Sequence, residues 1–207
     1  MNTFFTADTH FGHGGIMKHQ QRPFHDVDHM NEVLIKNWNS VVGRDDIVYH
    51  LGDFCWGGPI AASVYRRRLN GRIHLIIGNH DKYALREPEL WDSISHYKEA
   101  NVQSQYLPNG RQIIILCHYA FKVWNGSHNG TWSLYGHSHG NLKDDPNSTS
   151  LDVGVDCWDF FPVSCSQLAN AMGKKTFKPV DHHGRDNLDE TITKVLSESL
   201  PAGNGNP

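Results

Sequence analysis

The sequence predicts an α/β fold whose first half forms a layered sheet of parallel strands. Two observations lead to this class. Three short apolar runs alternate with two segments of helical periodicity, in the order strand, helix, strand, helix, strand. Each apolar run also stops at a polar residue, and in layered α/β folds functional sites gather at the carboxyl ends of such strands.

The first half of the chain supplies five elements. Apolar residues of the long helix recur with a period near 3.6, and Asp28 is its expected N-cap. Pro59 is expected to open the second helix, because proline is favoured in the first turn. In chain order we expect a strand over 3–7, a helix over 28–42, a strand over 46–51, a helix over 59–69 and a strand over 72–77.

The second half is richer in strands and ends in an extension. Ser164 begins a helix, with Gln167 three residues on as in a capping box. We divide the chain into a domain over 1–173 and an extension over 174–207. The extension has a modest amphipathic helix near 187–199, expected to pack on the body rather than bind a partner, and a Gly/Asn/Pro end that we expect to be disordered. The expected strands lie over 102–106, 112–117, 131–135 and 151–157.

Composition narrows the class of protein. The formal net charge of −3 argues against a broad basic surface for long nucleic acids, but leaves nucleotides and short DNA or RNA ends open. No apolar run approaches the ~20 residues of a membrane span, and the N-terminus does not resemble a secretory signal, so the cytoplasm is the expected location. The four cysteines form no C-x-x-C pair and are expected to be free thiols.

The fifteen histidines are the unusual feature, and several of them follow predicted strands together with oxygen ligands. Residues two apart in extended backbone point to the same side, as do the members of D-x-H and H-S-H. A cage of nitrogen and oxygen ligands without a thiolate suits Mn²⁺, Fe, Zn²⁺, Co²⁺ or Ni²⁺ better than Ca²⁺. The candidate ligands are Asp8, His10, Asp53, Asn79, His118, His137 and His139.

These motifs occur in the order D-x-H, G-D, G-N-H-D, a strand-ending histidine, and G-H-S-H. In this order they resemble the calcineurin-like metallophosphoesterase family, over roughly residues 1–160. The resemblance implies a four-layer αββα sandwich with mixed sheets and a centre of two divalent metal ions, with Mn²⁺ expected first. One ion would take Asp8, His10, Asp53 and His139; the other would take Asp53, Asn79, His118 and His137, so that Asp53 bridges the pair.

The family also implies roles for two residues beside the cage. His80 would stand near the leaving group, where it donates a proton or stabilises charge; the alternative is a histidine that only supports the ligands. Asp81 would orient His80 through a hydrogen bond, or else would stabilise a turn or cap a helix.

Other residues near the motifs give weaker indications. His13 either touches the substrate phosphate or caps the glycine-rich turn over 11–15. Arg22 is a candidate phosphate clamp, against the alternative of a solvated loop arginine. His50 and His74 lie inside strands and are expected to be core histidines. Four aromatic residues either form a stacking wall for a nucleobase or pack in the core: Trp56, Tyr119, Trp124 and Trp132.

The expected function is two-metal hydrolysis of a phosphate ester, by in-line attack of a metal-bridging hydroxide. We favour a phosphodiesterase, because no long insertion forms a lid over a small monoester. The alternatives are a phosphomonoesterase or nucleotide phosphatase on the same centre, and a nuclease acting on short nucleic-acid ends. A non-catalytic scaffold would be expected to have lost ligands or His80, and neither is lost. The natural substrate and the oligomeric state stay open.

Overall fold

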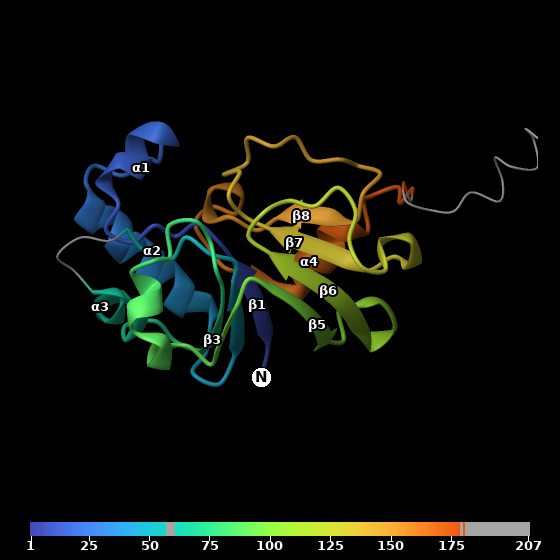
Figure 1. The fold of residues 1–207 in the computed structure, drawn as a ribbon, viewed down its shortest axis with the longest axis horizontal. Coiled ribbons are helices and arrows are strands. Elements are labelled where there is room, and N and C mark those ends of the chain that lie inside the picture. The colour runs from blue at the N-terminus through green and yellow to red at the C-terminus, as the bar shows by residue number, and fades with distance from the viewer. Residues whose placement is uncertain (57–60, 179, 181–207) are drawn as a thin grey trace, which may run out of the picture.

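The structure is a computed structural model that describes residues 1–56, 61–178 and 180. Two β-sheets pack face to face, with helices α2 and α3 on the far side of the first sheet (Figure 1). The first sheet has the order β4-β3-β2-β1-β9 and the second has the order β5-β6-β7-β8. The strands are β1 (Thr3–Thr6), β2 (Ile47–His50), β3 (Arg72–Ile76), β4 (Ser93–Ser95), β5 (Tyr97–Gln103), β6 (Arg111–Cys117), β7 (Trp132–Tyr135), β8 (Ser150–Asp152) and β9 (Val163–Ser164).

Both sheets are mixed, as the resemblance implies. Strands β1 to β4 are parallel neighbours, which confirms the parallel first half, and β9 joins the edge of β1 antiparallel. In the second sheet β5 and β6 are antiparallel, whereas β6, β7 and β8 run parallel. The carboxyl ends of the parallel strands within each sheet therefore lie at one edge of that sheet.

Within the described residues, four α-helices and five short 3-10 turns connect the strands. The apolar stripe of α2 is buried through Met30, Leu34 and Trp38, which lie in one cluster with Phe4 and the other outward residues of the first sheet. The α-helices are α1 (Gly14–His19), α2 (Val27–Val41), α3 (Ala62–Arg66) and α4 (Cys165–Met172), and the 3-10 turns are η1 (Ala84–Arg86), η2 (Pro88–Leu90), η3 (Pro108–Gly110), η4 (Ser127–Asn129) and η5 (Val155–Cys157).

A second core fills the space between the two sheets. Because successive side chains of a strand point to opposite faces, Phe4 of β1 faces the helices while Phe5 faces the second sheet. Phe5 packs in one cluster with Ile114 and Leu134 of the second sheet, and all three are fully buried. Each such side chain contributes about 1.5–3 kcal/mol when removed from water. This core holds the two sheets, and the loops at their edges, in a fixed relation.

Several element boundaries differ from those expected. The N-cap of α2 is Asp26, whose side chain accepts a hydrogen bond from the backbone N–H of His29, so Asp28 lies inside the first turn. The strand expected over 102–106 is β5, which lies earlier. The strand expected over 151–157 divides into the short β8 and the turn η5, because Asp152 turns back to bond the N–H of Gly154. The capping box of Ser164 and Gln167 is confirmed.

The described part of the extension runs along β8. The Thr176 N–H bonds the Pro146 carbonyl at 2.7 Å, and the Lys175 ammonium reaches Asp144 and the Ser150 carbonyl at 2.6 Å each. The helix expected near 187–199 and the opening of the helix expected over 59–69 lie outside the described residues. Within the described residues, no helix is long and apolar enough to cross a membrane.

Candidate metal centre

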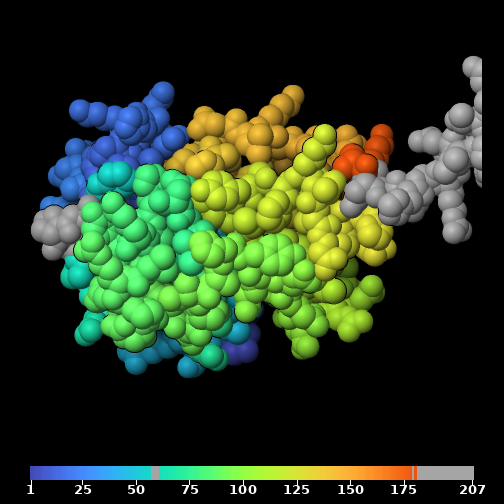
Figure 2. All heavy atoms as spheres, viewed as in Figure 1, coloured from blue at the N-terminus to red at the C-terminus, as the bar shows by residue number. Residues whose placement is uncertain are grey.

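Short loops after five strands carry all seven candidate ligands. Asp8 and His10 follow β1, Asp53 follows β2, and Asn79 follows β3. From the second sheet, His118 follows β6, and the G-H-S-H loop follows β7. The parallel pairing brings these loops to the edge where the two sheets meet, and this explains how ligands 131 positions apart in sequence come together. In Figure 2, the blue N-terminal segment and the yellow-orange segment beyond β7 stand on either side of a notch at the upper edge of the molecule.

The ligands form two groups. Potential ligand atoms of Asp8, His10 and His139 lie within 4.8 Å of one another, and we name this group the first half-site. Asp53, His118 and His137 form the second half-site by the same measure. Each group holds three members of one of the two ligand sets that the family resemblance implies.

Asp53 lies between the half-sites. Its Oδ2 atom is 3.6 Å from His10 Nε2 on one side and 3.6 Å from His118 Nε2 on the other. The Asn79 Oδ1 atom is 3.0 Å from the same His118 nitrogen. One carboxylate oxygen of Asp53 is therefore equally near to a histidine nitrogen of each half-site.

Hydrogen bonds fix which nitrogen of two histidines faces the centre. His118 Nδ1 lies 2.7 Å from the Leu51 carbonyl, and His139 Nδ1 lies 2.7 Å from Asp156 Oδ2. Both partners accept, so the N–H of each neutral ring is best satisfied on Nδ1. At His118 the Nε2 atom then faces a second acceptor, Asn79 Oδ1 at 3.0 Å, and a cation between these two atoms would satisfy both lone pairs. Outer partners of this kind orient metal-ligating histidines and raise their basicity.

The residues present fit a pair of dications. Asp8 Oδ1 and His10 Nε2 are buried and have no hydrogen-bond partner among the described residues. The other Asp8 oxygen accepts the His137 N–H at 2.9 Å, and Asp53 Oδ1 accepts the His80 N–H at 2.8 Å. Burying unpartnered polar atoms is unfavourable unless a cation or another partner satisfies them. The orphaned atoms therefore mark where metal coordination would take place.

Backbone strain is concentrated at the ligands. Five of the seven candidates have positive φ angles, between 48° and 66°: Asp8, His10, Asp53, His137 and His139. Residues with a Cβ adopt this left-handed conformation at a cost of about 1–2 kcal/mol each, and such residues cluster at functional sites. Close packing adds to the constraint, because a Cβ on Gly136 would lie 2.6 Å from Asp8 Oδ2.

Burial shifts the pKa values of a carboxylate and of two histidines at the centre in opposite directions. Burial, and then the neighbouring carboxylates of Asp53 and Asp152, raise the pKa of Asp8 well above its ordinary value. Burial, and then the nearby His139, lower the pKa of His10 well below its ordinary value. Burial also lowers the pKa of His118. His10 and His118 are thus held neutral, in the form that binds a metal.

Comparison with known proteins identifies the family. The sequence model of the calcineurin-like phosphoesterase family matches residues 1–189 of this chain. The chain belongs to this family. Its members are metal-dependent phosphoesterases, so this protein is a metal-dependent hydrolase of phosphate esters.

Relatives occur in archaea, phages and bacteria. The chain is 34% identical to an uncharacterized protein of Methanocaldococcus jannaschii, over 83% of this chain and 91% of the relative. It is 29% identical to the Gene 66 protein of Mycobacterium phage L5, over 76% and 87% of the two chains. The crystal structure of a protein of unknown function from Aquifex aeolicus matches with a TM-score of 0.64 and 25% identity, over 82% of this chain and 98% of that one.

His80 stands at the mouth of the phosphoesterase centre. Its side chain is 37% exposed, and its Nε2 atom is 4.0 Å from Asp53 Oδ2. The ring also contacts His10, with 5.5 Å between ring centroids. A histidine that is partly exposed beside the bridging carboxylate can reach a bound substrate, as the expected role requires.

The hydrogen bonds of Asp81 fit the second of its two expected roles, stabilisation of a turn. Its carboxylate is buried and accepts three backbone N–H groups, from Asp53 at 2.9 Å, Phe54 at 2.8 Å and Gly78 at 2.7 Å. Among the described residues, none of its hydrogen bonds goes to His80. The prediction that Asp81 orients His80 is therefore wrong. The carboxylate instead ties the loop after β2 to the loop after β3, and so fixes the backbone of the bridging ligand.

Two exposed aromatic rings flank the centre. Trp56 is 41% exposed and stacks on His13, with 4.0 Å between centroids and 11° between planes. Burial, and then the neighbouring His80, lower the pKa of His13 to about 4. Tyr119 is 47% exposed and contacts His118 and His137 at 5.0 and 4.9 Å.

The other two tryptophans do not belong to a stacking wall. Trp132 is buried between the sheets, and the indole N–H of Trp124 bonds Thr131 within its own loop. His50 and His74 are held by hydroxyl groups, at 3.0 Å from Thr9 Oγ1 and 2.7 Å from Ser93 Oγ. Neither histidine belongs to the two half-sites.

Arg22 is buried, and it is neither the phosphate clamp nor the solvated loop arginine that the sequence suggested. Its side chain is 0% exposed, so it is not a solvated arginine and has no surface to offer a substrate. Its guanidinium forms a bidentate pair with Asp156, at 2.8 Å for each bond. Burial would raise the pKa of Asp156, but hydrogen bonds from His139 and Arg22 hold it below its ordinary value.

Sequence reasoning missed two carboxylates near the G-H-S-H loop. Asp156 holds His139, and Asp152 accepts the Ser138 hydroxyl at 2.5 Å and the Gly140 N–H at 3.1 Å. The available signal was that two acidic residues four positions apart interrupt an otherwise apolar run over 151–157.

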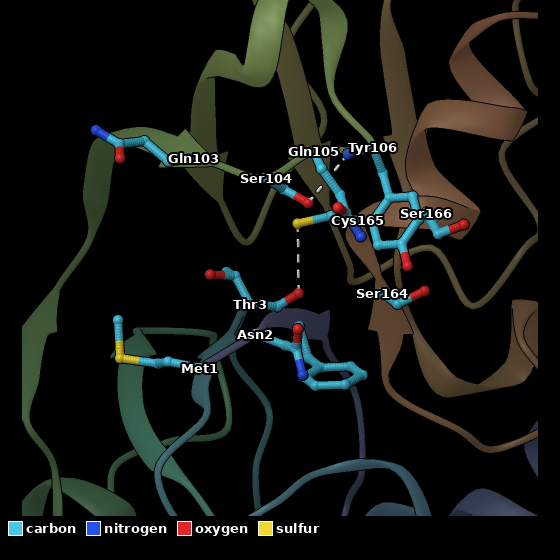
Figure 3. Close-up of a pocket in the computed structure, with 11 residues that line it drawn as sticks. Met1, Asn2, Thr3, Gln103, Ser104, Gln105, Tyr106, Ser164, Cys165 and Ser166 are labelled. Carbon is cyan, nitrogen blue, oxygen red and sulfur yellow. Dashed lines mark hydrogen bonds between the residues drawn. The ribbon is translucent and has the colours of Figure 1, made fainter.

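A cavity of about 460 Å³ lies away from the metal centre, at the amino end of β1 (Figure 3). The first four residues, the segment over 103–106 and the start of α4 line it. Cys165 donates from Sγ to the Thr3 carbonyl at 3.4 Å on its wall. The ligands follow the carboxyl ends of the strands, so this cavity is separate from the catalytic centre.

Proposed function

We propose that this phosphoesterase holds two divalent metal ions, with Mn²⁺ as the expected ion, and cleaves phosphodiesters. The observation that carries the proposal is the position of Asp53, with one oxygen 3.6 Å from a histidine nitrogen of each half-site. A carboxylate shared in this way suits two ions close together, and two ions about 3.5–4 Å apart are the arrangement that supports in-line displacement at phosphorus.

The donors favour transition metals. The first ion would be held by Asp8, His10 and His139, the second by Asn79, His118 and His137, with Asp53 between them. Four imidazoles with carboxylate and amide oxygens suit Mn²⁺, and also Fe, Zn²⁺, Ni²⁺ or Co²⁺. When bound, the ions would lower the pKa of a water molecule and neutralise charge on the phosphate. The two carboxylates only partly cancel the charge of two dications, so the site would attract an anion.

His80 supplies the proton that the leaving oxygen needs. Its ring is partly exposed beside the bridging carboxylate, and its backbone N–H is fixed by Asp53 Oδ1 at 2.8 Å. This places an imidazole with a free edge at the mouth of the site. Donation from such a side chain contributes about 10²–10⁴-fold to the rate.

The openness of the site supports a diester. The His137 and Asn79 side chains belong to exposed residues, and two aromatic rings stand beside the centre, Trp56 against His80 and Tyr119 against His137. A diester carries two organic substituents on phosphorus, and the exposed aromatic rings beside the centre can receive them. Stacking of a nucleobase on an aromatic side chain is worth about 1–3 kcal/mol. A nucleotide diester or a short nucleic-acid end is therefore the substrate class that we favour.

The test compares a diester and a monoester reporter with metal-free protein to which single metals are added back. We expect Mn²⁺ to restore hydrolysis of bis-p-nitrophenyl phosphate, with a higher kcat/KM than for p-nitrophenyl phosphate. Asp53→Asn, which weakens the bridge, serves as the inactive control. A preference for the monoester would contradict the diesterase assignment, and no turnover of either reporter with any first-row metal would contradict the whole proposal.

A further inference from the structure

The Arg22 side chain, in the loop between α1 and α2, forms hydrogen bonds that reach well beyond that loop. Its Nη2 donates to the Asp8 carbonyl at 2.7 Å and to Asp156 Oδ2 at 2.8 Å. Its Nη1 donates to the Thr9 carbonyl at 3.2 Å, and its Nε donates to Asp156 Oδ1 at 2.8 Å. The guanidinium thus joins the backbone of the D-x-H motif to a carboxylate 134 positions away.

Asp156 carries this link onward to a metal ligand. Its Oδ2 atom accepts from Arg22 and also lies 2.7 Å from His139 Nδ1. An acceptor at that point keeps the proton on Nδ1 and leaves Nε2 free to face the centre. Through Asp156 the arginine therefore reaches the third member of the first half-site.

The second half-site is supported differently. His118 Nδ1 bonds the Leu51 carbonyl at 2.7 Å, and Asp81 fixes the backbone of Asp53 at 2.9 Å. None of the Arg22 hydrogen bonds goes to a residue of that half-site. The two groups of ligands are thus linked by the His137 N–H on Asp8 Oδ2, but the outer side chains that support them are different residues.

We propose that Arg22 and Asp156 are positioning residues that set the affinity and geometry of the first half-site alone. The inference rests on the proposed two-metal function. Asp8, His10 and His139 have φ angles of 58°, 49° and 48°, so surrounding contacts must hold their backbone in place. A planar guanidinium can bind one carboxylate through two bonds and still donate to two carbonyls, which a lysine ammonium cannot reproduce.

The pair acts through geometry rather than through added charge. The positive charge of Arg22 and the negative charge of Asp156 cancel, so the network leaves the net charge of the half-site unchanged. Removing one partner would leave the other charge buried and unpaired. Asn at position 156 retains a single acceptor oxygen in place of two, so it cannot accept from both Arg22 Nε and His139 Nδ1.

The test measures Mn²⁺ binding, so it does not depend on turnover. Metal-free wild-type protein, Arg22→Met, Arg22→Lys and Asp156→Asn are titrated with Mn²⁺ by calorimetry, and loaded samples are examined by electron paramagnetic resonance. The matched control is Arg66→Met. Arg22 donates to two backbone carbonyls and Arg66 to three, those of Leu69, Gly71 and Leu90, none of which is a candidate ligand. Circular dichroism checks that each variant is folded.

We expect wild-type protein and Arg66→Met to bind two ions that are magnetically coupled. Arg22→Met and Asp156→Asn should weaken one of the two binding steps by about 10–100-fold, as loss of an outer partner does. With one ion added per chain, these variants should give the spectrum of isolated Mn²⁺. Arg22→Lys should be intermediate. The substitution His118→Ala disables the second half-site. In that background, Arg22→Met should weaken the binding of Mn²⁺ to the half-site that remains.

The outcomes separate the two hypotheses. Two ions bound by every Arg22 and Asp156 variant with wild-type affinities would overturn the positioning role while leaving the two-metal function intact. Equal weakening of both steps, or weakening by Arg66→Met, would overturn the claim of selectivity. Failure of wild-type protein to bind two ions would overturn the two-metal proposal itself. If Arg22→Met does not fold, Asp156→Asn and Arg22→Lys give the same comparison.

Discussion

Asp8 and Asp53 divide their two carboxylate oxygens between the backbone and the centre. In each residue one oxygen accepts a backbone N–H from another loop, and the other faces histidine nitrogens or has no partner among the described residues. The N–H bonds come from His137 and His80, which are themselves site residues. A single carboxylate therefore both joins two loops and presents a ligand atom, so replacing it changes geometry as well as charge.

His80→Ala should separate catalysis from metal binding. The ring stands beside Asp53 but lies in neither of the two ligand groups, so the variant should keep its metal content. Loss of proton donation should lower kcat by about 10²–10⁴-fold, most for substrates with a basic leaving group. Metal analysis and turnover measured on one preparation check both statements.

The control for this variant is His25→Ala, whose ring is 70% exposed and pairs with Asp26 away from the ligands. It should leave both metal content and kcat unchanged. Loss of metal from His80→Ala would instead make His80 a ligand and contradict its assigned role.

The grouping of the candidate ligands could be predicted from sequence because they lie in short motifs that follow apolar runs. Asp81 and Arg22 could not, because their roles depend on backbone groups to which no sequence pattern points. Asp81 accepts three N–H groups from two loops, and Arg22 donates to the carbonyls of Asp8 and Thr9. Asp156 escaped notice because the apolar alternation around it favoured a strand.

At the scale of elements, the strands are short and end where the ligands begin. Strands β1, β2 and β7 have four residues each, and the positive φ angles of Asp8, Asp53 and His137 fall just beyond them. The left-handed residues turn the chain away from the sheet, so the next side chain faces the edge. Sequence placed β1, β2, β3, β6 and β7 within a residue or two, because apolar runs mark buried strands. It missed β4 and β9, with three and two residues, because they are too short to carry a pattern.

The start of α2 offers a test of the corrected cap. Asp26 Oδ1 accepts the His29 N–H at 2.8 Å, whereas Asp28 lies within the first turn. We expect Asp26→Ala to lower Tm by roughly 2–4 °C, because it removes a side chain that satisfies a free N–H group of the helix. Asp28→Ala should lower Tm less, since it loses only a favourable interaction with the helix dipole.

Thermal unfolding of the two variants in one buffer makes this comparison. The hydrogen bond from His29 is also the first cause that lowers the pKa of Asp26. The contribution of the cap should therefore be present at neutral pH and be lost as the pH falls through the lowered pKa of the folded state. An equal or larger effect of Asp28→Ala would favour the boundary expected from the sequence.

At the scale of the whole molecule, each half-site takes ligands from both sheets. The first combines Asp8 and His10 after β1 with His139 after β7, and the second combines Asp53 after β2 with His118 and His137. The core holds the two sheets together on one side of these loops. Bound ions would join the two sheets at the edge where the loops lie. A centre loaded with metal would thus be a structural link as well as a catalytic one.

Removal of metal should therefore destabilise the entire domain. An ion present at 100 times its Kd adds about 2.7 kcal/mol to the stability of the state that binds it, and for a chain of this size that corresponds to a rise in Tm of about 5–10 °C. Without ions, Asp8 remains buried near Asp53 and Asp152. Burial is the largest cause that raises its pKa, and these two carboxylates raise it further. Differential scanning calorimetry of one preparation, first treated with chelator and then reloaded with Mn²⁺, measures the difference. Asp53→Asn should show a smaller difference, because the ligand shared by both half-sites is weakened. Equal Tm values for wild-type protein with and without metal would mean that the ions do not join the sheets.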